Sequence, residues 1–357
     1  MRSVMVINLG LKSIRCIIFD SEGHKLSSAA VAINTAINDK RVEQDPEEWW
    51  EKAIIVIQKA FKESKLCRVD YITVTSSASC LVCVDKECNP LGRALMISDK
   101  RAKKEVEIIQ IMPEFQTVYQ QTKLDISVSL MLPKILWVKR NRAELFEKTA
   151  YFMTPNDYLL FKLCGHCVTD YLNAAKFHYN LKEKIYPIQL LEKLGISIHS
   201  LPKVVDIGSS VGRVRSSLAE NLGVNTDLEV VVTSYDAICS FIGSGVSEEG
   251  EASDVSGTVT VFRTLSYKKD VKESSKVYSV PFYEENASII GGSNNLGGGL
   301  IEWVKQCYYQ KENYPYEIME KEAGESDIGA KGLVFLPYLL GERAPLWDDN
   351  ARGVFSV

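Results

Sequence analysis

A chain of 357 residues with 46% hydrophobic and 25% charged residues has the composition of an ordinary globular protein and enough length for two domains. Its formal net charge of -4 and the lack of long runs of like charge argue against a nucleic-acid partner, and no apolar run approaches the roughly 18 residues that a membrane span needs. The nine cysteines are odd in number and scattered, so we expect reduced thiols and a cytoplasmic protein.

The sequence predicts three short strands in the first thirty residues. Apolar runs at 4–7 and 14–19 flank a tight turn, Asn8–Ser13, in which we expect Gly10 to take a positive φ angle. A polar turn at 20–23 then leads to a third strand at 24–30. The pattern predicts two consecutive hairpins.

A long helix should follow, with Asp45 as its N-cap, Pro46 in its first turn and Glu48 completing a capping box. Its apolar residues recur at helical spacing and predict one buried face: Trp49, Trp50, Ala53, Ile54, Ile57, Ala60 and Phe61. Further strands are expected at 71–75 and 81–84, and helices at 100–111, 132–147 and 155–163. The alternation of strands and helices predicts a layered α/β fold.

The strand–turn–strand pattern returns in the last third of the chain. Strands at 252–255 and 259–265 flank the small polar turn Ser256–Thr258 and echo the first two strands. Each turn can offer backbone N–H groups and a small hydroxyl to phosphate oxygens, although either one alone could be an ordinary hairpin. The repeat therefore indicates two related loops that could face a phosphate.

Two groups of cysteines have a structural and a chemical interpretation. Cys164 and Cys167 have the spacing of a thiol–disulfide site, but they follow a helix that Gly165 should end, and the end of a helix does not stabilise a thiolate. Cys80, Cys83 and Cys88 could supply three metal ligands, yet Cys83 lies in an expected buried strand. We interpret both groups as structural.

The segment Leu336–Phe355 (LPYLLGERAPLWDDNARGVF) closely resembles the segment by which FGGY-type sugar kinases are recognised. Five other segments are similar to the same family and occur in the same order: Val42–Trp50, Leu91–Ala102, Val168–Lys176, Thr233–Gly245 and Gly291–Trp303. The chain is therefore identified as a member of the FGGY carbohydrate kinases, most similar to the ribulokinase and xylulokinase branches.

The resemblance implies an α/β fold of the actin-like ATPase (ribonuclease H-like) type, with two domains flanking a cleft. Residues 1–245 correspond to the N-terminal, sugar-binding domain and residues 246–357 to the C-terminal, nucleotide-side domain. In the family the chain continues through a helical region and a glycine-rich adenosine loop, so we expect the second domain to be incomplete here and to bind ATP less well than the first domain binds sugar.

The activity implied by the resemblance is phosphorylation of a sugar hydroxyl by ATP with Mg²⁺. Asp236 stands where the family has its catalytic general base, although an aspartate there could also cap the helix that follows. The expected acceptor is a ketopentose (ribulose or xylulose) or a related polyol, held by Ser77, Ser79, Asp99 and Asp236. The serines replace the Gln-Met-His-Gly run of xylulose kinases, and a water-solvated serine loop is the alternative.

The nucleotide side is likewise carried over from the family. The expected phosphate-binding and nucleotide-binding residues are Gly10, Lys12, Ser13, Gly257, Thr258, Gly298 and Glu302. Asn8, where the family has an aspartate, and Asp236 are the positions expected near magnesium; Asn8 lacks the charge that magnesium favours. The alternative function is therefore a non-catalytic sugar- or nucleotide-binding protein. The expected partner is a small sugar or polyol, with no nucleic acid and no membrane, and assembly as a homodimer is left open.

Overall fold

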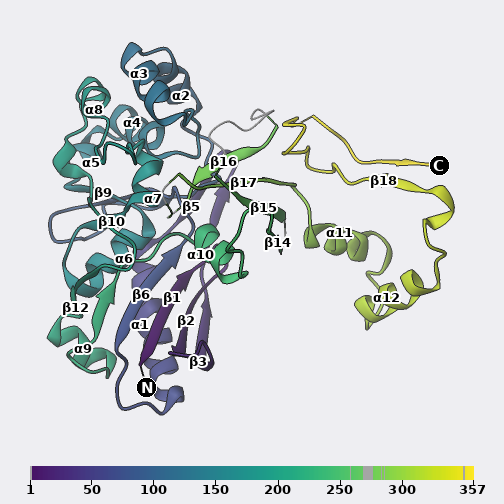
Figure 1. Cartoon of the computed structure of the whole chain (residues 1–357), viewed down its shortest axis with the longest axis horizontal. Helices are drawn as coiled ribbons and strands as arrows, with labels where there is room; N and C mark the ends of the chain where they lie inside the picture. The colour runs from purple at the N-terminus through teal and green to yellow at the C-terminus, as the bar shows by residue number, and fades with distance from the viewer. Residues whose placement is uncertain (1, 258, 268–275, 283, 285, 349) are drawn as a thin grey trace. The chain divides into compact units, whose positions relative to one another are not determined.

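The computed structural model in Figure 1 describes residues 2–257, 259–267, 276–282, 284, 286–348 and 350–357. The chain divides into two compact units, Met1–Cys239 (unit 1) and Ser240–Val357 (unit 2).

Unit 1 is built on a six-stranded sheet with the order β12-β13-β6-β1-β2-β3. Its strands are β1 (Ser3–Leu9), β2 (Ser13–Asp20), β3 (Lys25–Ala32), β6 (Tyr71–Ser76), β12 (Ser210–Arg213) and β13 (Glu229–Val231). The first three strands pair antiparallel, as their hairpin turns predict, whereas β6 runs parallel to β1 and β13 parallel to β6. Because Asn8 pairs with Thr75 and Leu9 with Ser76, the loops that follow β1 and β6 start at the same edge of the sheet.

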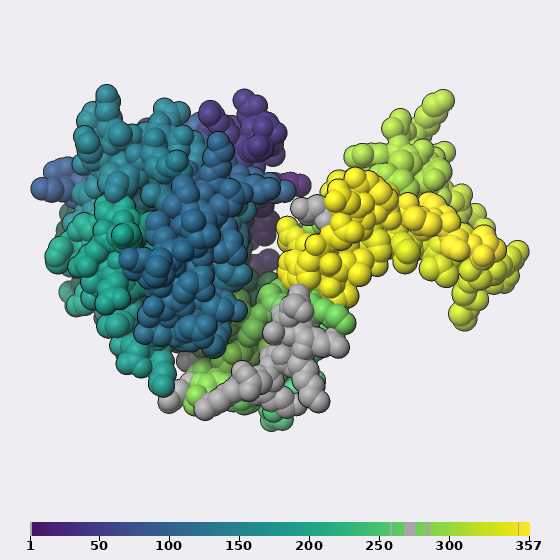
Figure 2. Space-filling view, turned by 90° about the horizontal axis from the view of Figure 1, so that it is seen from above, coloured from purple at the N-terminus to yellow at the C-terminus, as the bar shows by residue number. Residues whose placement is uncertain are grey.

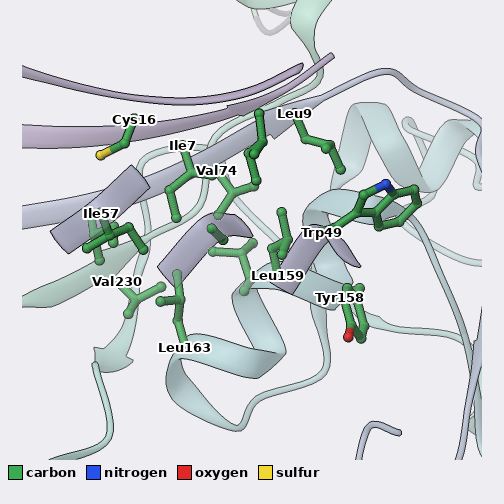
Figure 3. Close-up of a cluster of buried hydrophobic side chains, with 14 of the residues drawn as sticks. Ile7, Leu9, Cys16, Trp49, Ile57, Val74, Tyr158, Leu159, Leu163 and Val230 are labelled. Atoms are coloured by element: carbon green, nitrogen blue, oxygen red, sulfur yellow. The ribbon is translucent and has the colours of Figure 1, made fainter. Parts of the chain in front are cut away.

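The main core of unit 1 lies between this sheet and two helices, α1 (Pro46–Ser64) and α6 (Pro155–Cys164). Alternate residues of β1, among them Ile7 and Leu9, are buried against them. Figure 3 shows Trp49 of α1 beside Tyr158 of α6, and their rings meet edge to face with centroids 6.4 Å apart. This contact joins the two helices that cover the sheet.

The start of α1 is partly as the sequence predicts. Asp45 is the N-cap and accepts a hydrogen bond from the backbone N–H of Glu47, with Pro46 in the first turn. The predicted capping box is wrong, because the Glu48 carboxylate turns to other partners: it accepts from the side-chain amide of Asn34 at 2.8 Å and from Lys52. A loop residue 14 positions earlier and a lysine one helical turn later have replaced the N-cap backbone as partners of Glu48.

A second core lies in a group of helices that contains α2 (Lys103–Gln110), α3 (Pro113–Thr122), α4 (Met131–Asn141), α5 (Ala143–Lys148) and α8 (Ile188–Leu194). Figure 1 draws them together at one end of unit 1, and in Figure 2 they form much of its blue and teal surface. The single helix predicted at 132–147 is wrong, because Arg142, with φ -143° and ψ 54°, leaves the helical conformation and separates α4 from α5.

Shorter elements complete unit 1. They are β4 (Ala36–Asn38), β5 (Arg41–Gln44), β7 (Val82–Val84), β8 (Ala94–Leu95), β9 (Tyr151–Met153), β10 (Val168–Asp170), α7 (Tyr171–Ala174), η1 (Ala175–Phe177), η2 (Ile198–Ser200), β11 (Lys203–Val205) and α9 (Ser216–Leu222). They form three small sheets, β4-β5-β8, β7-β9 and β10-β11. The helix α10 (Asp236–Gly243) follows the last strand of the main sheet.

Unit 2 contains a four-stranded antiparallel sheet with the order β14-β15-β17-β16. Its elements are β14 (Ala252–Ser256), β15 (Thr260–Ser266), β16 (Tyr278–Pro281), β17 (Ser288–Ser293), α11 (Gly298–Tyr308), α12 (Pro315–Glu325), η3 (Ala330–Gly332), β18 (Val334–Leu336) and β19 (Val354–Ser356). The strands predicted at 252–255 and 259–265 are confirmed as β14 and β15.

The cysteines have the structural role expected of them. Gly165 ends α6 with φ 81°, so Cys164 lies at the end of that helix, and burial raises the pKa values of both Cys164 and Cys167. Burial also raises the pKa of Cys80 to about 11 and those of Cys83 and Cys88 to about 12. Within the described ranges, no group of three or more metal-binding side chains comes together, and no helix has both the length and the apolarity needed to cross a membrane.

Candidate functional site

The loop after β1 is held by a backbone hydrogen bond of its own and by two side chains from other segments. The Gly10 N–H donates to the Ser13 carbonyl at 3.0 Å, and the Leu11 carbonyl accepts from the side chains of Thr35 and Gln44, each at 3.0 Å. The predicted positive φ at Gly10 is wrong: its φ lies outside the left-handed region, and an added Cβ would make ordinary contact, 3.5 Å from the Ser13 oxygen. The three residues between β1 and β2 make the turn without a left-handed residue.

Besides Gly10, three of the residues expected to face phosphate or magnesium lie on or beside this loop. Asn8 is half-buried near the end of β1, and Lys12 is exposed at the loop's tip. The Ser13 hydroxyl accepts a hydrogen bond from Nε of Arg15 at 3.2 Å. The loop therefore presents an uncharged amide, a cation and a hydroxyl within one short stretch.

Asp236 is the first residue of α10, where the partial positive charge of a helix N-terminus favours an anion. The Ser77 hydroxyl donates to its Oδ2 at 3.1 Å. Ser234, two positions before Asp236, is held by two hydrogen bonds. Thr75 donates to its carbonyl at 2.9 Å, and its hydroxyl donates to buried Asp170 at 2.9 Å. The structure thus brings together two of the predicted site residues, Ser77 and Asp236.

The loop after β6 carries both predicted serines, but in different surroundings. Ser77 is half-buried, whereas Ser79 is buried and has φ 60°, a conformation that non-glycine residues adopt rarely. Just before them, the Ser76 hydroxyl donates to the side-chain amide oxygen of Asn156. The loop is therefore anchored at the last residue of β6, directly before it begins.

Asp99 is almost completely buried, with 1% of its surface exposed. Its carboxylate accepts from the backbone N–H of Val42 at 2.9 Å and from the Arg101 guanidinium at 2.6–3.0 Å. Arg101 also bonds Glu43 at 2.6 Å, and these carboxylates raise the pKa of Arg101 despite its burial. Arg101, Asn156 and Asp170 were not among the predicted site residues, although Arg101 and Asp170 lie inside segments that carry the family resemblance.

In unit 2 the turn after β14 packs against the start of α11. The Gly298 N–H donates to the Gly257 carbonyl at 2.7 Å, and a Cβ added to Gly298 would lie 2.7 Å from that same oxygen. An added Cβ at Gly297 would lie 2.3 Å from Oγ1 of Thr260. Two glycines are therefore required at this helix N-terminus, which is the kind of position where backbone N–H groups bind phosphates.

Glu302 and Thr258 are the other two predicted site residues of unit 2. Glu302 lies on α11, where it pairs with Lys305 at 2.7 Å and accepts from the Tyr316 hydroxyl. Thr258 lies outside the described residues.

This chain resembles known proteins in both sequence and fold. It is 27% identical to a xylulose kinase of Staphylococcus xylosus over 99% of this chain and 74% of the relative, and 26% identical to a gluconokinase of Bacillus subtilis over 98% of this chain and 70% of the relative. A gluconate kinase and a ligand-bound xylulose kinase from Lactobacillus acidophilus each share the fold, with a TM-score of 0.88 at 24% identity over 100% of this chain and 72% of theirs.

The fold of these sugar kinases confirms the predicted α/β, actin-like ATPase class. The model of the FGGY family of carbohydrate kinases, N-terminal domain, matches residues 3–243, and the model of its C-terminal domain matches residues 252–356. The chain therefore belongs to the FGGY family of carbohydrate kinases, which are phosphotransferases that use ATP and act on an alcohol group.

Proposed function

We propose that this protein transfers the γ-phosphoryl group of ATP to a hydroxyl of a ketopentose, ribulose or xylulose, or of a related polyol. The contact that carries the proposal is the 3.1 Å hydrogen bond from Ser77 to Asp236, because it orients a carboxylate at a helix N-terminus. The relatives named as xylulose kinases support a ketopentose, and those named as gluconokinases make gluconate a necessary comparison.

In this proposal Asp236 is the general base. The acceptor oxygen attacks the γ-phosphorus, the bond from that phosphorus to the bridging oxygen breaks, and ADP leaves with the electron pair. The hydroxyl proton passes to the Asp236 carboxylate, whose other oxygen Ser77 holds in place. A carboxylate is basic enough, since proton transfer is late when the transition state is loose.

The remaining residues are assigned to the two substrates. We assign Ser77, Ser79 and Asp99 to the sugar, with Asp99 held in position by Arg101. To the phosphates and the nucleotide we assign Gly10, Lys12, Ser13, Gly257, Thr258, Gly298 and Glu302. With this assignment, residues 1–245 form the sugar-binding domain and residues 246–357 form the nucleotide-side domain.

Magnesium is proposed to bind near Asn8 and Asp236. One amide and one carboxylate are a sparse ligand set, and they fit an ion that keeps several waters and takes its other ligands from phosphate oxygens. When bound, it would neutralise charge on those phosphates. Asn8 and Asp236 would accept hydrogen bonds from its waters rather than enclose it.

A non-catalytic binding protein is the second candidate, and the observation that favours it is the missing charge at Asn8. A coupled assay of ADP release with ribulose, xylulose, gluconate and a set of polyols separates the two. Turnover that depends on one of these acceptors supports the kinase. Sugar binding in calorimetry without any turnover supports the second candidate.

A further inference from the structure

A lysine is buried beside the proposed sugar site. Lys134 of α4 has 0% of its surface exposed, and its ammonium group donates to the backbone carbonyl of Ser79. Burial lowers the pKa of Lys134 to about 8; Cys80 and Asp99 act to raise it, and Arg101 acts to lower it further. Placing a lysine here is costly to the fold, because its charge is removed from water.

The bond from Lys134 is made to an unusual stretch of backbone. Ser79 has φ 60°, and such a conformation persists where surrounding contacts fix it. Two residues earlier in the same loop, Ser77 donates to Asp236. The loop after β6 is therefore held at Ser76 by Asn156 and at Ser79 by Lys134, with Ser77 between the two anchors.

The same face of α4 reaches the second proposed sugar segment. Trp137 lies one helical turn after Lys134, and the Arg101 guanidinium lies over its ring, 4.8 Å from the centroid. Arg101 in turn holds both oxygens of Asp99. One helix face thus contacts both the serine loop and the Asp99 segment.

We infer that Lys134 is a positioning residue of the sugar site, which holds the Ser77–Ser79 loop so that the Ser77 hydroxyl meets the Asp236 carboxylate. The inference rests on the proposed function for the identity of that site. Lys134 acts through Ser79 and does not itself touch the substrate. A fold in need of packing alone would be served as well by methionine, because methionine fills a similar volume and has no charge to remove from water.

The test compares Lys134→Met with Lys139→Met. Lys139 lies on the same helix and also donates to a backbone carbonyl, that of Leu194 at 2.7 Å, which belongs to α8 and not to the serine loop. Calorimetric titrations with ribulose, with xylulose and with an ATP analogue give the two affinities. We expect Lys134→Met to weaken sugar binding about tenfold with nucleotide binding unchanged, the loss typical of a charged hydrogen bond.

Lys139→Met should change neither affinity. Unchanged sugar affinity in Lys134→Met, or an equal loss of sugar and nucleotide affinity, would overturn the inference. If Lys134→Met does not fold, the wild type decides: its sugar affinity should fall between pH 7 and pH 9.5 as Lys134 loses its proton, and a flat profile would contradict the role.

Hydrogen–deuterium exchange separates this inference from the proposed function. Peptides covering residues 76–81 should exchange faster in Lys134→Met than in the wild type or in Lys139→Met, with or without any activity. Wild-type protein that neither binds nor phosphorylates any of the sugars would refute the proposed function. Faster exchange would still support the hold of Lys134 on the loop, whereas unchanged exchange would refute it.

Discussion

The Ser77 hydroxyl and the Asp236 carboxylate lie 3.1 Å apart although 159 residues separate them in the sequence. The contact joins the loop after a central strand of the sheet to the first residue of α10. A hydroxyl that donates to one carboxylate oxygen also orients the other oxygen. The contact therefore supports a chemical role for Asp236.

Asp236→Asn should abolish sugar-dependent ADP release, by about a thousandfold or more, while sugar binding stays measurable. Asparagine keeps the volume and one acceptor oxygen for Ser77 but cannot take up the proton. A coupled assay and a calorimetric titration on the same preparation measure both quantities. Turnover within a few-fold of the wild type would remove Asp236 from the mechanism.

Asn8→Asp should raise magnesium-dependent turnover or nucleotide affinity, because a carboxylate gives magnesium or its waters an anionic partner. The measurement is turnover and ATP affinity over a series of magnesium concentrations. Asn8→Ala is the control, since it removes the amide without adding charge. If the magnesium dependence is the same in Asn8→Asp as in the wild type, attention moves to Lys12 as the residue that sets it.

Gly298→Ala should weaken nucleotide binding by about tenfold and leave sugar affinity unchanged, because its methyl group must displace the Gly257 carbonyl, 2.7 Å away. Gly324→Ala is the matched control, for a Cβ at that helical glycine meets nothing within 4 Å. Alanine should stabilise α12 slightly. Equal nucleotide affinities in the two variants would place the phosphates elsewhere.

The free energy of unfolding should fall as the pH drops from about 6.5 to about 4, in part because of His178. Burial lowers the pKa of His178 from 6.5 to about 4, so in this window the unfolded chain binds a proton that the folded protein does not. The contribution is fully present above pH 6.5 and amounts to at most about 3 kcal/mol.

His178→Leu should flatten this part of the stability profile, measured by urea unfolding at a series of pH values. His199→Leu, at an exposed position, should leave the slope as it is in the wild type. A profile equally steep in His178→Leu would show that other groups cause the acid sensitivity.

Local signals in the sequence predicted the elements whose causes are local. Asp45 and Pro46 start α1, and Gly165 ends α6, because caps depend on neighbours a few residues away. Where a partner distant in sequence competes, the local signal is misleading: Asn34 takes the Glu48 carboxylate from the capping box, and the break at Arg142 has no glycine or proline to announce it.

The residues of the candidate site also differ in how far the sequence alone predicts them. Asp236 and Ser77 were found from residue type and family resemblance, and their contact is an outcome of the fold. The role of Lys134 could not be predicted from the sequence, because a lysine in an amphipathic helix is expected to lie on the solvent face. Only the packing of α4 against the loop after β6 shows that its ammonium group is buried.

The pairing of β1 with β6 has a consequence for engineering the proposed acceptor site. The register that sets Asn8 opposite Thr75 is fixed by backbone hydrogen bonds and by buried neighbours such as Ile7 and Val74, none of which belongs to a loop. Segments grafted after Ser76 would start from the same place whatever their length. On the proposed assignment of Ser77 and Ser79 to the sugar, acceptor preference can be redesigned in this one loop while Asn8 stays in place on the neighbouring strand.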